Sequence, residues 1–545
     1  MFPRLEASEI DRIRRFGEAR HYAAGESIFK VGEVAPGLVV IVKGQVKVTH
    51  RQTWHGGHIT LHEPGSFMGE LAQLAGRPAL VDSHAQGPVA ALVIAPDRLR
   101  ALFIAEAELG ERIMRALILR RVGLLEDGTG GPVIIGAASN GDVLRLEGFL
   151  RRNAHPHQQL DPEIDAEAKA LIERFHVHAG QLPIVLCPGG ALLHNPTETQ
   201  LARCIGLLKP LDPNRVYDVA VIGAGPAGLA TAVYASSEGL SVLMLDCRSF
   251  GGQAGASARI ENYLGFPTGI SGIALMARAY NQAQKFGVEI AIPSEAISLA
   301  PAGATRGDLM LNLQDRQSVV ARSVVIATGA RYRRPALDNL DAFEATSVHY
   351  WASPLETKLC SGQEIALVGG GNSAGQAAVY LAGKASKVWL LVRGPGLTAM
   401  SQYLVDRITG IGNIEVVTNA RVTALEGSSG MLKAIRWQRA GTGDETRKEI
   451  KHLFLFIGAD PNTDWLAGSD VVLDAKGFVK TGSDLGSERH ALETSRNRVF
   501  AIGDVRSAST KRVAAAVGEG AQVVAAIHAV LAGLGETVRP PGRSS

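Results

Sequence analysis

Two glycine-rich turns are the parts of this chain whose residue types and spacing most clearly indicate chemistry. The first reads GAGPAG over residues 223–228, and it stands between an apolar run and a helical pattern. Gly223 would form the tight turn, Gly225 would let the backbone approach a pyrophosphate, and Gly228 would let the helix pack on the strand. The helix N-terminus would present free N–H groups to the phosphates. A turn with only a structural role is the alternative interpretation.

Acidic and small residues at the ends of later strands support a dinucleotide site. The strand predicted over residues 241–245 ends at Asp246, about 20 residues beyond the turn, where a carboxylate can hold ribose hydroxyls. A second buried strand ends in Thr328 and Gly329, and a third one ends in Gly503 and Asp504. Strand, turn, helix and acid together favour a dinucleotide site over a structural turn.

The second turn reads GGGNSA over residues 369–374 and repeats the same strand, turn and helix order. The strand after its helix ends at Arg393 instead of an acid. A guanidinium can hold a 2′-phosphate with two hydrogen bonds, so this residue favours NADPH over NADH. An inherited fold that binds the nucleotide weakly or not at all is the alternative.

Four segments between these turns and beyond them carry a family resemblance. GGQAG (251–255), RIENYLGFP (259–267), IATGA (326–330) and AIGDV (501–505), in this order, resemble the low-molecular-weight thioredoxin reductases. The resemblance covers about 320 residues, from Tyr217 to Leu531, and implies FAD and NADPH as cofactors.

The resemblance and the turns together give two sets of candidate residues. The FAD set is Gly223, Gly225, Pro226, Ala227, Gly228, Asp246, Gly252, Gln253, Asn262, Thr328, Gly329, Gly503, Asp504, Arg512, Val513 and Ala514. The NADPH set is Gly369, Gly371, Asn372, Ser373, Ala374 and Arg393. In the first set, Asp504 is expected on the ribityl chain. The helix that begins near Arg512 should aim its positive end at the pyrimidine end of the flavin.

The chain departs from that family at two places. Thioredoxin reductases carry a C-x-x-C pair before the second glycine turn, but the aligned positions here are about Trp351 to Pro354 and hold no cysteine. Cys360 stands alone, and we expect it to pack rather than react. The family also has two arginines after the second strand and a third nearby, where this chain has Arg393, Gly394 and Thr398.

Residues 16–120 resemble a cyclic-nucleotide-binding domain of the catabolite-activator type. The turn Gly69-Glu70-Leu71-Ala72 is the candidate ligand site, with its amides facing a cyclic phosphate and Glu70 facing a ribose hydroxyl. Ala79 stands where such domains carry an arginine, and Asp82 replaces a hydroxyl residue. Since a carboxylate repels phosphate, we expect cyclic nucleotides to bind poorly.

The middle segment resembles a thioredoxin- or glutaredoxin-like fold. Its predicted order is β, α, β, α, β, β, α, and Leu182-Pro183 matches the cis-proline before the third strand. The place of a redox C-x-x-C reads Ala137-Ala-Ser-Asn-Gly-Asp142, so we expect a docking or spacer domain without redox chemistry.

Composition excludes several other classes of protein. The 545 residues are 46% apolar and 20% charged with a net charge of +3, which indicates a globular protein without a nucleic-acid or membrane surface. We expect a cytoplasmic protein. The four cysteines, Cys187, Cys204, Cys247 and Cys360, include no C-x-x-C, so we expect neither a metal cluster nor a disulfide framework.

The predicted architecture is multidomain. It has an N-terminal β-barrel (1–126), a middle α/β thioredoxin-like domain (132–208), and a C-terminal α/β flavoprotein with an FAD domain (216–333 and 459–535) and an NAD(P)H domain (334–458). The predicted function is electron transfer from NADPH through FAD to an external small-molecule or protein acceptor, in a homodimer, with no side-chain catalytic residue. A flavin-based sensor with little turnover is the alternative.

Overall fold

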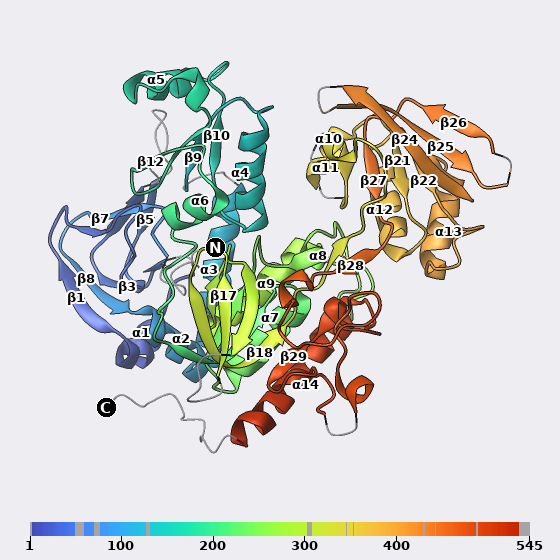
Figure 1. Ribbon diagram of the computed structural model, residues 1–545. Coiled ribbons are helices and arrows are strands. Elements are labelled where there is room, and N and C mark those ends of the chain that lie inside the picture. The colour runs from blue at the N-terminus through green and yellow to red at the C-terminus, as the bar shows by residue number, and fades with distance from the viewer. Residues whose placement is uncertain are drawn as a thin grey trace.

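The computed structural model describes residues 3–49, 59–69, 77–126, 131–301, 308–344, 346–352, 354–428, 431–441, 443–486 and 489–533. Its sheets follow one another in chain order, from the blue N-terminal sheets to the orange and red C-terminal part (Figure 1). Each sheet falls inside one of the predicted segments, whose boundaries stay predictions.

The N-terminal segment forms two antiparallel four-stranded sheets, ordered β1-β8-β3-β6 and β2-β7-β4-β5. Their strands alternate buried and partly exposed side chains: in β4, Val46 and Val48 are buried, while Lys47 and Thr49 are partly exposed. The elements are α1 (Ala7–Ile13), β1 (Glu18–Tyr22), β2 (Ser27–Phe29), β3 (Leu38–Lys43), β4 (Val46–Thr49), β5 (Ile59–His62), β6 (Phe67–Met68), β7 (Asp82–Ala85), β8 (Val89–Ile94), α2 (Pro96–Ala105) and α3 (Ala107–Glu126).

The middle segment has the element order that the sequence predicts. Its sheet is ordered β10-β9-β11-β12, with β9 and β10 parallel and β11 antiparallel to both its neighbours. The Leu182–Pro183 bond is cis. The elements are β9 (Val133–Ile135), α4 (Gly141–Arg152), β10 (Gln158–Leu160), α5 (Ala166–Arg174), β11 (Ile184–Leu186), β12 (Leu192–His194) and α6 (Glu198–Cys204).

A disulfide in this segment was not predicted from the sequence. Cys187 follows β11 and Cys204 ends α6, and their sulfur atoms are bonded with the Cα atoms 5.9 Å apart. The sequence predicts no disulfide framework, and it gives no sign of this single bond. The fold brings the ends of these two elements together across 17 residues of chain, a spacing that matches no motif.

The third segment is a seven-stranded sheet, ordered β15-β14-β13-β18-β17-β16 with β29 beside β18. The strands β13, β14, β15, β18 and β29 are parallel, so their carboxyl ends meet at one edge. The elements are β13 (Val216–Ile222), α7 (Pro226–Ser237), β14 (Val242–Leu245), α8 (Gly252–Gly255), α9 (Gly272–Lys285), β15 (Glu289–Ala291), β16 (Ala296–Pro301), β17 (Leu309–Leu313), β18 (Ser318–Ile326), β29 (Val499–Ala501) and α14 (Val513–Ala532).

The fourth segment is a parallel sheet, ordered β20-β27-β21-β22-β23, with a three-stranded antiparallel sheet, β24-β25-β26, beside it. The pair β19–β28 belongs to the chain that crosses between this segment and the third one (Figure 1). The elements are β19 (Ala330–Tyr332), α10 (Leu340–Phe343), β20 (Val348–His349), α11 (Pro354–Leu359), β21 (Glu364–Val368), α12 (Asn372–Ala382), β22 (Lys387–Leu391), α13 (Gln402–Gly410), β23 (Ile414–Val417), β24 (Ala420–Ser428), β25 (Met431–Arg439), β26 (Glu445–Lys448), β27 (Leu453–Leu455) and β28 (Ala459–Pro461).

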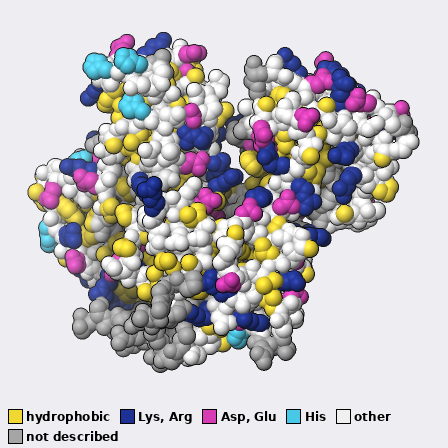
Figure 2. Space-filling model, in the orientation of Figure 1, with side chains coloured by type: hydrophobic (Ala, Val, Ile, Leu, Met, Phe, Trp, Pro, Cys, Tyr) yellow, Lys and Arg dark blue, Asp and Glu magenta, His cyan; other side chains and the backbone are white. Residues whose placement is uncertain are grey.

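The N-terminal and middle segments are packed onto the third segment. Residues of α4 and α6 share one buried apolar cluster with residues of β16, β17 and β18. From the barrel, the guanidinium of Arg77 donates to the hydroxyl of Tyr280 on α9 and lies 5.9 Å from that ring's centre. The middle segment is therefore docked and does not act as a free spacer. Figure 2 shows a cleft between the fourth segment, at the upper right, and the middle segment, at the upper left.

The C-terminal helix α14 lies against the first glycine-turn helix, α7. By length and composition alone α14 could cross a membrane. A Cβ at Gly520 would lie 2.6 Å from the Ala227 carbonyl oxygen, so only glycine allows this close crossing. A Cβ at Gly518, on the same helix, would meet nothing within 4 Å.

The same substitution at these two glycines should have opposite effects on stability. Gly520→Ala forces α14 away from α7 and should cost about 1–3 kcal/mol, because overpacking a fixed contact strains the backbone. Gly518→Ala should be neutral or stabilise by about 0.5–1 kcal/mol through a lower entropy of the unfolded chain. Thermal unfolding of the two variants checks this, and equal melting temperatures would show that the crossing is not tight.

Candidate functional site

The first glycine turn is built as the sequence predicts, with a different constraint at each glycine. Gly223 has φ 111°, and its Cβ would lie 2.2 Å from the Ala327 carbonyl oxygen. A Cβ at Gly228 would lie 1.9 Å from the Gly223 carbonyl oxygen, so the helix can sit this close only without a side chain. A Cβ at Gly225 would meet nothing closer than Gly252 Cα at 3.9 Å. The fold itself therefore requires Gly223 and Gly228, while Gly225 borders open space.

Three long helices begin without a side-chain cap at the predicted nucleotide sites. The N-cap residues are Gly225 for α7, Gly371 for α12 and Arg512 for α14, and none makes a side-chain cap hydrogen bond. The first N–H groups of an α-helix have no partner within the helix and need an external acceptor. Phosphate oxygens or other anionic groups of a ligand can supply it.

Asp246 lies at the end of β14 and supports the turn. One of its carboxylate oxygens accepts from Ala224 N at 2.9 Å, and the other accepts from Arg248 N and Ser249 N. Burial raises the pKa of the Asp246 carboxyl, although these N–H groups favour its charged form. The predicted contact with a ribose hydroxyl stays a prediction.

Gly251 and Gly252 close the other side of the space above Gly225. Gly251 has φ 100° and donates its N–H to the Ala224 carbonyl at 2.7 Å, and Gly252 has φ 53°. The amide of Gln253 donates to the Ala330 carbonyl at 2.5 Å, which joins α8 to the start of β19. The two glycine segments thus lie backbone against backbone, since a Cβ at Gly252 would lie 3.1 Å from Gly225 Cα.

The turn after β29 holds Asp504 in place through α14. Glu519 accepts from Gly503 N at 2.6 Å and pairs with Arg506, so it ties the Gly503–Asp504 turn to the helix. Burial raises the pKa of the Asp504 carboxyl. Glu519 was not predicted from the sequence, although it is the only acid in the apolar helix pattern 513–532.

Two more residues at this edge were missed from the sequence. Asn462 and Thr328 are joined by two hydrogen bonds. The side-chain amide of Asn462 donates to the backbone carbonyl of Thr328 at 2.9 Å, and the Thr328 hydroxyl donates to the backbone carbonyl of Asn462 at 2.8 Å. Burial and the nearby Asp504 raise the pKa of Tyr332 to about 12, so its hydroxyl stays protonated at neutral pH. Asn262 lies on a different cavity, which it shares with Arg407 of α13.

The second glycine turn repeats the design of the first. Gly369 has φ 153°, and its Cβ would lie 2.9 Å from Ala374 Cβ, so small residues are needed at both positions. A Cβ at Gly371 would meet nothing within 4 Å. The amide oxygen of Asn372 accepts from Ser401 N at 2.7 Å, so it is already used within the protein. Ser373, the next residue of the helix, is exposed and its hydroxyl can face a ligand.

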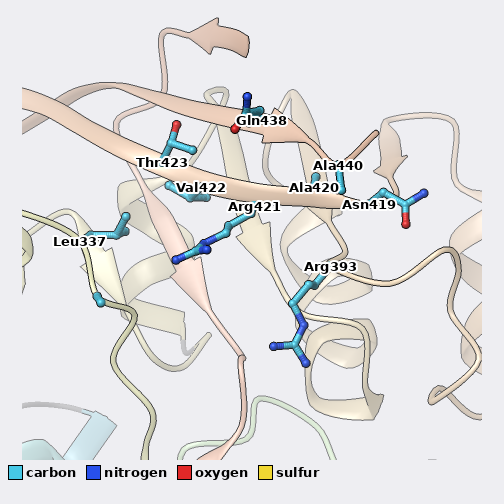
Figure 3. A pocket seen from close by; sticks show the side chains of 10 residues that line it. Leu337, Arg393, Asn419, Ala420, Arg421, Val422, Thr423, Gln438 and Ala440 are labelled. Carbon is cyan, nitrogen blue, oxygen red and sulfur yellow. The ribbon is translucent and has the colours of Figure 1, made fainter. Parts of the chain in front are cut away.

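Arg393 follows β22 as predicted and lines a cavity of about 350 Å³. A second arginine, Arg421, lines the same cavity, and its side chain extends toward Leu337 (Figure 3). Arg421 lies on β24, a strand for which the sequence predicts no functional residue.

The place of the family dithiol contains no sulfur. Trp351 donates from its indole N–H to Glu356 at 3.0 Å, and Ala352 is buried. Cys360 lies in the apolar core of the fourth segment, where burial raises its thiol pKa to about 12. A thiol with that pKa stays protonated at neutral pH and is therefore a poor nucleophile. The packing role predicted for Cys360 fits this position.

Two buried histidines lie next to that place. His349 Nε2 and His452 Nδ1 are 3.1 Å apart. Burial lowers the pKa of His349 to about 3, so the ring stays neutral near pH 7. Burial also lowers the pKa of His452, and since imidazole cannot carry an electron pair, this histidine pair does not replace the redox role of a dithiol.

The N-terminal candidate turn is described only at Gly69, since Glu70, Leu71 and Ala72 lie outside the described residues. Arg120 of α3 donates to the Gly69 carbonyl at 2.9 Å and lies over the Phe67 ring. Ala79 is buried, and Asp82 accepts from Val31 N at 2.8 Å. The Asp82 carboxylate thus serves the fold of the barrel.

Comparison with known proteins follows this division of the chain. Residues 217–520 match the family model described as "Pyridine nucleotide-disulphide oxidoreductase", which is more than half of the chain. The chain belongs to this family. Residues 19–106 match the model described as "Cyclic nucleotide-binding domain". The two dinucleotide sites of the family take FAD and NADPH, and the glycine turns described above fit both.

Similar curated proteins are reductases. One component of the alkyl hydroperoxide reductase of Escherichia coli is 30% identical over 319 residues, which are 57% of this chain and 58% of that protein. NADPH-dependent thioredoxin reductase 3 of Arabidopsis thaliana is 33% identical over 61% of this chain and 63% of that protein. The chain thus spans about three fifths of these two relatives. Thioredoxin reductase of Mycoplasmopsis pulmonis is 32% identical, over 57% of this chain and 96% of that protein.

Solved structures agree with this relationship. The thioredoxin reductase of T. acidophilum superposes with a TM-score of 0.53 at 28% identity, over 58% of this chain and 99% of that one. The Lactococcus lactis thioredoxin reductase in its FR conformation gives 0.54 at 26% identity, with the same coverage.

Gly225→Val should separate cofactor binding from folding. The new side chain enters space that the protein leaves open, so the variant should fold with a normal circular dichroism spectrum but purify without FAD. Gly228→Val, which collides with the backbone of the turn, should lose FAD and fold together. Absorbance at the flavin band per mole of protein measures loading, and a fully yellow Gly225→Val protein would refute the assignment.

Proposed function

We propose that this protein is an FAD-dependent oxidoreductase that takes electrons from NADPH and passes them directly to an external acceptor. The observation that carries the proposal is the combination of two intact dinucleotide turns with a dithiol position that holds no cysteine. When bound, FAD supplies the two-electron chemistry, accepting hydride from the nicotinamide and reducing the acceptor.

The residues of the chain bind and orient, and none needs to act as a catalytic acid or base. Gly225 and the N-terminal N–H groups of α7 hold the FAD pyrophosphate, and Gly371 with the N-terminus of α12 holds that of NADPH. The first N–H groups of α14, at Val513 and Ala514, stabilise negative charge at the pyrimidine end of the flavin ring. Glu519 keeps Asp504 in position for the ribityl hydroxyls.

The fourth segment has no dithiol that could receive electrons from the flavin, so the acceptor has to be a separate molecule. Thioredoxin reduction in the family uses two neighbouring sulfurs, because a disulfide is cleaved by thiolate exchange. Here Cys360 is a buried thiol, and the Cys187–Cys204 disulfide lies in the middle segment. A quinone, a small disulfide or a redox protein is the class of acceptor that direct transfer suits.

We further propose that the protein functions as a homodimer in the cytoplasm. A flavin-based sensor with little turnover is the alternative function, and the similarity to several reductases favours the enzyme. Steady-state NADPH oxidation with a panel of acceptors discriminates the two, since a sensor would show only a single turnover.

An anaerobic titration with NADPH tests the electron path. If electrons stop at the flavin, one equivalent of NADPH per FAD should complete the bleaching of the flavin absorbance. Cys360→Ser should leave both this stoichiometry and acceptor turnover nearly unchanged, because the buried Cys360 thiol is not a thiolate at neutral pH.

The middle disulfide provides the control. The titration is repeated with Cys187→Ser/Cys204→Ser, which cannot take up an electron pair in that bond. Uptake of a second equivalent by the wild type alone would identify this disulfide as an internal acceptor. Such a result would contradict direct transfer to an outside molecule.

The N-terminal barrel should bind cyclic AMP poorly, because Ala79 provides no guanidinium for the phosphate and Asp82 adds a negative charge. Calorimetry should show no binding in the micromolar range for the wild type, and Ala79→Arg with Asp82→Thr should increase the affinity. Micromolar binding by the wild-type protein would contradict the expectation.

A further inference from the structure

The cavity beside Arg393 collects positive charge from two separate parts of the fourth segment. Arg393 lies just after β22 and Arg421 is the second residue of β24. Both line the cavity of about 350 Å³, and the described residues that line it include no acid. Figure 3 shows the Arg421 side chain directed toward Leu337, while the Arg393 side chain extends in another direction from the same wall.

Backbone hydrogen bonds fix the two arginines relative to each other. Ala420 N donates to the Val392 carbonyl and Asn419 N donates to the Gly394 carbonyl, each at 2.9 Å. These bonds tie the residues on either side of Arg393 to the two residues before Arg421. Arg421 is held further by its register with Gln438 in β25. The spacing of the two backbone positions is therefore a property of the fold, and the exposed side chains extend from fixed points.

Neither guanidinium is neutralised within the part of the chain that the structure describes. No carboxylate there pairs with Arg393 or Arg421, and both side chains are exposed. Other arginines of the same small sheet behave differently: Arg436 and Arg447 both bind Glu426. A cavity with two uncompensated cations and no acid suits a ligand group with more than one negative charge.

We propose that Arg421 is a specificity-determining residue that binds the 2′-phosphate of NADPH together with Arg393. This inference rests on the proposed function, since it places the nucleotide on the second glycine turn. The end of the strand that follows the turn helix is where the adenosine ribose lies in such folds, which puts the 2′ position beside Arg393. Arg421 thereby takes the place of a second arginine that would follow Arg393, where the chain has Gly394.

The chemistry of the phosphate explains why one arginine is not enough. A phosphate monoester carries close to two charges at neutral pH and presents three acceptor oxygens. One guanidinium fork engages two of these oxygens, and a second satisfies the third and balances the remaining charge. NADH has a hydroxyl at this position, so the pair of arginines gains nothing from it.

Binding measurements on the full FAD-loaded protein test the inference without relying on turnover. The probes are adenosine 2′,5′-bisphosphate, AMP and inorganic phosphate, followed by calorimetry. Arg421→Ala should weaken binding of the bisphosphate about tenfold, the usual effect of losing a hydrogen bond to a charged group, and should change AMP binding less than twofold. Lys433→Ala, which removes an exposed cation elsewhere on β25, is the matched control and should change neither.

A rescue variant separates recognition from a general structural effect. A Cβ at Gly394 would have no neighbour closer than the Gly396 carbonyl at 4.0 Å, so Gly394→Arg can be accommodated. In the Arg421→Ala background, Gly394→Arg should restore bisphosphate affinity to within about threefold of the wild type, because it returns a second guanidinium to the phosphate. Failure of rescue together with an unchanged melting temperature would overturn the assignment.

The remaining outcomes distinguish this inference from the function on which it rests. If Arg393→Ala discriminates against the bisphosphate but Arg421→Ala does not, Arg421 has no role and NADPH use stands. If the wild type binds bisphosphate and AMP equally, both the inference and NADPH preference are wrong. If Arg421→Ala weakens inorganic phosphate and bisphosphate equally while AMP is unaffected, the pair is a general anion site and the assignment to NADPH fails.

Discussion

The close approach of backbone to backbone at the carboxyl ends of parallel strands is the constraint on which the C-terminal half depends. Gly223 and Gly228 are pressed against carbonyl oxygens, and Gly520 lets α14 cross α7 at the same corner. These contacts hold the starts of α7 and α14 at one edge of the sheet. Their uncapped N–H groups then need an anionic partner from outside. The fold thus requires Gly223, Gly228 and Gly520, while Gly225, between the first two, leaves open the space that a nucleotide would occupy.

This constraint also explains which features were visible in the sequence. Glycine turns, the strand-end acids Asp246 and Asp504, and the order of strands and helices are local signals, and they were predicted. In each case the local backbone requires the residue type, so the feature can be recognised from a short stretch of sequence. The absence of the dithiol was visible for the same reason.

The features that were missed all depend on residues that meet from distant parts of the chain. Glu519 reaches back to Gly503, and Arg421 lines the same cavity as Arg393 only because the start of β24 is bonded to the residues around Arg393. The Cys187–Cys204 disulfide joins elements whose separation matches no motif. A hydrogen bond or ion pair across tertiary structure leaves no periodic pattern, so it appears only once the fold is known.

The contact between Arg77 and Tyr280 joins the N-terminal barrel to the flavin edge of the third segment. Tyr280 stacks on Phe250 with ring centres 4.5 Å apart, and Phe250 directly precedes Gly251, which bonds to the first glycine turn. All three side chains are at most 9% exposed, so none can move without its neighbours. A barrel ligand that shifts this stack would change FAD affinity by the same factor by which FAD changes the affinity for that ligand.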